Sequence, residues 1–158
     1  MKFIKLLFIF VFAAFLQWMF DTRLTVFGFT PAFMYLAALG VAVSFRAPAA
    51  IAFAFCCGFY VDFLGGSLFG AHALTYTCAA FITGLLHKRM DLGSITTQML
   101  YCVVLASAEI VFMGLLALVF SGTFLWPGPK GFVLMPLFSG VISPLLFLLV
   151  AVLHTEEK

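Results

Sequence analysis

The chain has 158 residues, of which 65% are hydrophobic, 9% are charged and 22 are phenylalanine. Soluble domains carry about 25% charged residues, so this composition excludes a soluble enzyme, a nucleic-acid-binding protein and a disordered scaffold. Eight basic and six acidic residues give a net charge of +2, which is too small for a polyanion-binding surface. The composition therefore predicts an all-α polytopic membrane protein, because the apolar runs are too long and continuous for barrel strands.

Glycines, prolines and polar clusters divide the chain into six apolar segments, which we interpret as one integral membrane domain over residues 1–158. The predicted spans are Phe3–Phe20, Pro31–Phe45, Pro48–Leu64, Phe69–His87, Gln98–Phe120 and Leu134–Leu153. The second is short for a full crossing, so we expect it either to begin earlier, near Val26, or to lie in a locally thinned bilayer. The connections between spans are too short to contain a folded domain.

Basic residues predict the orientation of the bundle, because cytoplasmic segments of membrane proteins are enriched in Lys and Arg. If the N-terminus is inside, the inner segments hold six basic residues and the outer segments hold two. The inner six are Lys2, Lys5, Arg46, Lys88, Arg89 and Lys158; the outer two are Arg23 and Lys130. Both termini are therefore predicted to be cytoplasmic.

A ridge of small residues follows the third span and continues into the next turn. Its members recur at every fourth position: Ala50, Ala54, Gly58, Asp62, Gly66 and Gly70. In a bilayer, small residues define helix interfaces because they let two backbones approach closely. Two interpretations remain open: the ridge packs within the bundle, or it is the face that binds a partner.

Asp62 is predicted to lie just below the outer interface at the end of the third span. A carboxylate there is costly without a partner, and His72, just beyond the turn at Gly65, Gly66 and Ser67, is the best candidate. The pair either forms a local hydrogen bond that closes the hairpin or serves as a proton or ligand site.

Two further features lie in the last two spans. Glu109 stands near the middle of the fifth span and must face the bundle interior, either as a neutral packing group or in proton-coupled transport. Pro144, preceded by Ser143 and Gly140, predicts a kink in the sixth span. The chain carries no zincin motif and no carboxylate cluster, so we expect no enzymatic activity, no metal and no cofactor.

The stretch from Cys57 to Leu74, CGFYVDFLGGSLFGAHAL, resembles the signature of the bacterial rod shape-determining protein MreD family. That family typically shows a glycine and an aspartate in an apolar segment, then a small-residue turn and an L-G-x-x-A-L segment. Thr30-Pro31 before the second span, Lys88-Arg89 after the fourth, and Gly140 with Pro144 in the sixth also fit. Ala32 stands where many members have an acidic residue.

The resemblance implies a six-helix bundle similar to the substrate-binding subunits of energy-coupling-factor transporters, in the bacterial inner membrane. It also implies a non-enzymatic role in the cell-elongation complex, which organises peptidoglycan synthesis. The implied partners are a single-pass MreC-like protein, an MreB-like filament, a SEDS glycosyltransferase and a class B penicillin-binding protein. The alternative function is a small-molecule-binding subunit of a transporter, which would need an outward pocket with several convergent polar groups. The outer half offers chiefly Asp62, His72 and Arg23 for such a pocket.

Overall fold

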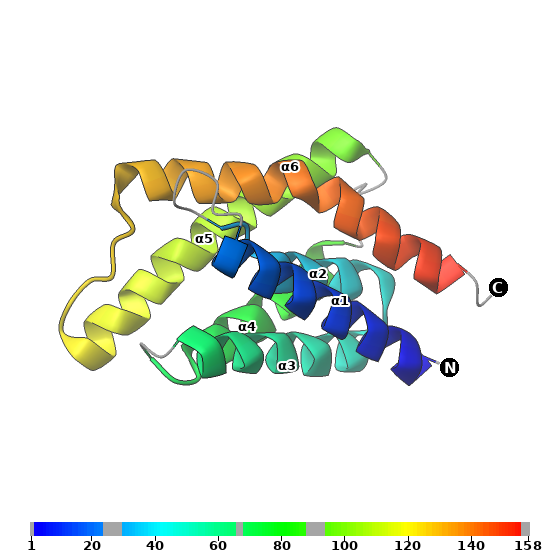
Figure 1. The fold of residues 1–158 in the computed structure, drawn as a ribbon, viewed down its shortest axis with the longest axis horizontal. Helices are drawn as coiled ribbons and strands as arrows, with labels where there is room; N and C mark the ends of the chain where they lie inside the picture. The colour runs from blue at the N-terminus through cyan, green and yellow to red at the C-terminus, as the bar shows by residue number, and fades with distance from the viewer. Residues whose placement is uncertain (1, 24–29, 66–67, 88–93, 156–158) are drawn as a thin grey trace.

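The structure, a computed structural model, describes residues 2–23, 30–65, 68–87 and 94–155. These residues form helices joined by short connections, and none of them is in a strand. The helices are α1 (Lys2–Arg23), α2 (Phe33–Ser44), α3 (Ala47–Gly65), α4 (Ala71–Leu86), α5 (Ile95–Ser121) and α6 (Gly128–Thr155). The start of α1 and the end of α6 lie at the same end of the molecule (Figure 1).

Helix α2 is the centre of the bundle. Every residue from Phe33 to Ala42 is buried, and α2 packs against α1, α3, α4 and α6. Large exposed hydrophobic side chains occur on all five other helices and on none of the α2 positions. The five outer helices therefore shield α2 and present their own apolar faces outward, as a bundle in lipid requires.

Four helices, α1, α3, α5 and α6, are long and apolar enough to cross a membrane, which makes the chain a multi-pass membrane protein. Helices α2 and α4 have 12 and 16 residues. At 1.5 Å per residue they extend about 18 and 24 Å, which is less than the roughly 30 Å hydrocarbon core.

The second helix does not begin early. Val26 lies outside the described residues, but Thr30, Pro31 and Ala32 are not helical, and α2 begins at Phe33. A residue before proline disfavours the helical region, which limits extension through Thr30. The Phe33 N–H also donates to Gln17 Oε1 of α1 at 3.0 Å, so α1 satisfies one of the free donors at the start of α2.

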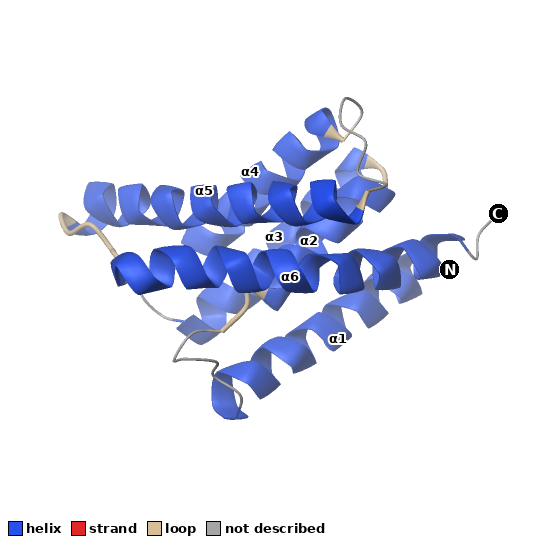
Figure 2. Cartoon of the chain, turned by 90° about the horizontal axis from the view of Figure 1, so that it is seen from above, coloured by secondary structure: helices blue, strands red, loops and turns tan. Residues whose placement is uncertain are grey.

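Helices α5 and α6 pack against each other; Figure 2 shows them from above, and Figure 1 shows that they cross and diverge toward the connection between them. Gly140 makes this packing possible, because a Cβ atom there would lie 2.5 Å from Val103 Cγ2 on α5. At the end of the bundle where α1 begins and α6 ends, Lys5 Nζ donates to the Leu153 carbonyl at 2.6 Å, which connects α1 to the last turn of α6.

Pro144 lies inside α6, where it cannot donate a hydrogen bond to the carbonyl of Gly140 four residues earlier. The Ser143 hydroxyl donates to that carbonyl instead, at 2.7 Å. Helix α6 stays continuous through this point but changes direction along its C-terminal half (Figure 1). A hydroxyl that replaces the lost backbone donor explains how the helix tolerates proline in an apolar environment.

Candidate functional site

The Asp62 carboxylate caps helix α4 from the neighbouring helix α3. Its Oδ1 accepts the His72 backbone N–H at 3.0 Å, and its Oδ2 accepts the Ala73 backbone N–H at 2.9 Å. Gly70, in the N-cap position, has no side chain and a φ of +93°, so α4 has no cap of its own. An acidic side chain at a helix N-terminus is also favoured by the helix dipole. Asp62 therefore serves as the missing cap.

The His72 side chain completes this contact. Its Nδ1 lies 2.9 Å from Asp62 Oδ1, so the expected contact between the two side chains is present. A carboxylate only accepts, which means that Nδ1 carries the proton and leaves Nε2 without one in the neutral ring. Asp62 is 3% exposed and His72 is partly exposed, so only the imidazole can meet a ligand.

Gly58 lets α3 and α4 approach closely enough for this capping contact. A Cβ atom at Gly58 would lie 2.5 Å from the Ala73 Cα and 2.6 Å from its nitrogen, in contact with the α4 backbone. Ala50 and Ala54, further down the same ridge, are also buried. Ala50, Ala54 and Gly58 thus pack inside the bundle, which favours the first of the two interpretations at these three positions. Gly66, which extends the pattern, lies outside the described residues.

An aromatic and hydroxyl network leads from His72 to Glu109. The His72 and Tyr76 rings meet edge to face with centroids 6.0 Å apart, and the Tyr76 hydroxyl lies close enough to the Glu109 carboxyl for the two groups to interact electrostatically. Tyr76 also packs on Tyr35 at 4.9 Å, and the Tyr35 hydroxyl donates to the Leu105 carbonyl at 3.1 Å. Glu109 thus lies on the side of α5 that is turned toward Tyr76 of α4.

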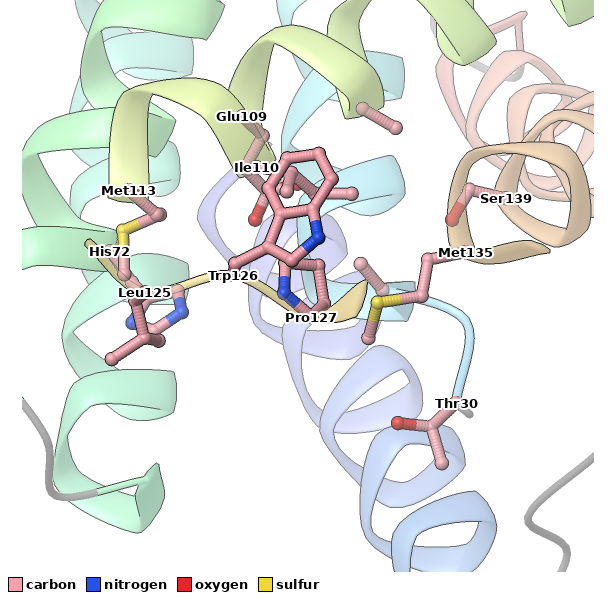
Figure 3. Close-up of a pocket in the computed structure, with 12 residues that line it drawn as sticks. Thr30, His72, Glu109, Ile110, Met113, Leu125, Trp126, Pro127, Met135 and Ser139 are labelled. Carbon is pink, nitrogen blue, oxygen red and sulfur yellow. The ribbon is translucent and has the colours of Figure 1, made fainter. Parts of the chain in front are cut away.

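His72 and Glu109 line one cavity of about 260 Å³. Ser139 of α6 and Thr30 before α2 also line it, while Trp126 comes from the connection between α5 and α6. Figure 3 shows these side chains arranged around the Trp126 ring, with Met113 and Met135 among the apolar groups. Asp62 is not among the lining residues, so only the His72 member of the pair faces this cavity.

Three members of this site were missed at the sequence level. Tyr76 follows His72 by one helical turn, so the i, i+4 spacing could have indicated it. Trp126 and Ser139 carry no comparable signal, because only the packing of α6 and its preceding connection brings them to Glu109. The site offers a carboxyl, an imidazole and hydroxyls that can bind or relay a proton or hold a small polar ligand.

In the part of the chain that the structure describes, no three His, Cys, Asp or Glu side chains are placed to hold a metal ion. No protein-family model matches the chain, and neither a curated protein nor a solved structure matches it.

Proposed function

We propose that this protein is a non-enzymatic membrane scaffold of the MreD type. It would form six transmembrane spans in the bacterial inner membrane, with both termini in the cytoplasm and a bundle similar to energy-coupling-factor substrate-binding subunits. There it would bind a single-pass MreC-like protein, beside an MreB-like filament, a SEDS glycosyltransferase and a class B penicillin-binding protein.

The observation that supports this proposal most is the structure of the stretch that resembles the family signature. Gly58, Asp62, Gly70 and His72 all contribute to the junction of α3 and α4, through close packing, capping and an αL turn. These residues hold α3 and α4 together, and a rigid junction of this kind suits a scaffold. The connections are also short: only residues 122–127 separate α5 from α6.

An apolar groove between α1 and α3 is the surface that we assign to the single-pass partner. It encloses about 460 Å³ and is lined by Phe3 and Leu7 of α1 and by Ala49, Ala52 and Cys56 of α3. These three α3 residues are small, exposed and spaced three and four positions apart, so another helix could approach the backbone there. This groove, unlike the buried ridge at Gly58, is available to a second protein.

Copurification tests the proposal. The tagged chain and an MreC-like single-pass protein would be coexpressed and purified in mild detergent, with an unrelated single-pass protein as the negative partner. Ala52→Phe should fill the groove and release the partner, whereas Ile82→Phe, on the exposed face of α4, should not. Failure to retain the MreC-like protein, or equal retention of the unrelated one, would refute the scaffold proposal.

The cavity beside Glu109 favours a second candidate, a small-molecule-binding subunit of a transporter. Its carboxyl, imidazole and indole groups converge on a volume of about 260 Å³, at the low end for a ligand pocket. Native mass spectrometry of the purified chain distinguishes the two: a transporter subunit should carry a vitamin-sized ligand that Glu109→Gln loses. A scaffold should release no such molecule and should retain its single-pass partner.

A further inference from the structure

A second cavity lies at the opposite end of the bundle, where α1 begins and α6 ends. It has a volume of about 910 Å³ and shares no lining residue with the cavity at Glu109. Its walls come from five places: Leu6 on α1, the end of α2, the turn between α2 and α3, the start of α3, and the C-terminal end of α4 with His87. Under the proposed orientation, this end meets the cytoplasmic leaflet.

The polar part of this cavity is basic. Arg46 and His87 line it, and no carboxylate is among the described residues that line it. The Arg46 side chain is exposed and has neither an ion pair nor a hydrogen bond within the described residues. An exposed arginine that no described carboxylate neutralises is available to an anion.

The start of α3 adds to this positive character. Arg46 immediately precedes α3, a helix of 19 residues with no acidic residue in its first turn. The N-terminal end of a helix carries a partial positive charge, so it favours the same anion as Arg46. Pro48 has no N–H and the Ala49 and Ala50 N–H groups donate to the Arg46 carbonyl, so the contribution of α3 is that of its dipole. Arg46 and the start of α3 therefore both contribute positive charge to the same part of the cavity.

Most of the remaining lining residues are apolar. Val43 from α2 and Phe81 and Leu85 from α4 are among them. A free phosphate ion would gain nothing from these side chains, whereas the acyl chains of a lipid would pack against them. Basic pockets between helices at the cytoplasmic interface are suited to anionic lipid headgroups.

We infer that this cavity binds an anionic phospholipid, with its phosphate at Arg46 and the start of α3 and its acyl chains against α2 and α4. The inference does not depend on the scaffold proposal, because it uses a separate cavity and requires no protein partner.

Native mass spectrometry of the full chain in detergent, titrated with phosphatidylglycerol or phosphatidylcholine of identical acyl chains, tests the inference. One arginine near the headgroup together with a helix N-terminus should favour phosphatidylglycerol by about tenfold. Arg46→Gln should weaken its binding about fivefold. Arg23→Gln, at the far end of α1, is the matched control and should leave the binding unchanged.

A second variant tests the cavity itself. A Cβ atom at Gly84, which lines the cavity, would meet no atom within 4 Å, so Gly84→Phe can extend into the space without displacing a neighbour. We expect this variant to remain folded and to lose the bound phosphatidylglycerol.

Three results would overturn the inference. Equal binding of the two lipids would show that the cavity does not prefer an anionic headgroup. Unchanged binding by Arg46→Gln would show that Arg46 does not hold the phosphate. Displacement of the lipid by millimolar inorganic phosphate would identify a free-phosphate site instead.

Discussion

Replacing Asp62 tests whether the junction of α3 and α4 depends on the helix cap. The two oxygens of this carboxylate accept two different backbone N–H groups, at 3.0 and 2.9 Å, in a site that is 3% exposed. Asp62→Leu leaves both donors without an acceptor. Each buried, unsatisfied donor costs about 1–3 kcal/mol, so the free energy of unfolding should fall by about 2–6 kcal/mol.

The free energy of unfolding of Asp62→Asn should lie between those of the wild type and Asp62→Leu. If the contact with the His72 ring were the only one, an amide oxygen could replace the carboxylate. The two backbone donors change this expectation, because an amide can accept at only one of its two terminal atoms. One N–H then faces an NH₂ group, and we expect a loss of about 1–3 kcal/mol.

Two controls separate capping from the side-chain pair. His72→Ala keeps the backbone donors and loses only the imidazole contact, so it should cost about 0.5–1.5 kcal/mol. Asp21→Asn changes an exposed carboxylate of α1 that, among the described residues, accepts from Gln17 alone, and the stability of this variant should equal that of the wild type.

The assay is equilibrium unfolding from mild detergent into SDS, followed by the reactivity of the buried Cys57 thiol in a background lacking Cys56, Cys78 and Cys102. Each variant is compared with that background protein. The capping account would be refuted by wild-type stability of Asp62→Asn, or by a loss in His72→Ala as large as that in Asp62→Leu.

Two further predictions concern packing and topology. Gly58→Ala should lower the unfolding free energy by at least about 1 kcal/mol, because its Cβ would overlap the Ala73 backbone. Gly65→Ala is the control, because its Cβ meets nothing within 4 Å. An equal unfolding free energy of the two variants would contradict close packing at Gly58. The basic-residue count predicts that, in a cysteine-free background in intact cells, a cysteine at position 94 is protected from an impermeant thiol reagent and a cysteine at position 123 reacts with it. The reverse labelling pattern would show that the bundle has the opposite orientation.

The sequence predicted the helices better than their ends. Proline and glycine clusters separated the six apolar segments, and each contains most of one helix. The predicted second span, Pro31–Phe45, lies within two residues of α2 at both ends, whereas the contact of the Phe33 N–H with Gln17 of α1 carries no signal in the sequence. The sequence does not decide whether Gly58 packs within the bundle or against a partner. Periodicity shows that small residues share one face of a helix, but it does not show which neighbour packs against that face.

Local sequence determined which segments form apolar helices and which residues on them need a partner. The apolar composition required helices, and the cost of an intramembrane carboxylate required a partner for Asp62. Tertiary structure decided that this partner includes the α4 backbone, that α2 is central, and that Trp126 and Ser139 join Glu109 around one cavity. These outcomes depend on contacts between residues far apart in the chain, and side-chain spacing along one helix carries no information about which other helix packs against it.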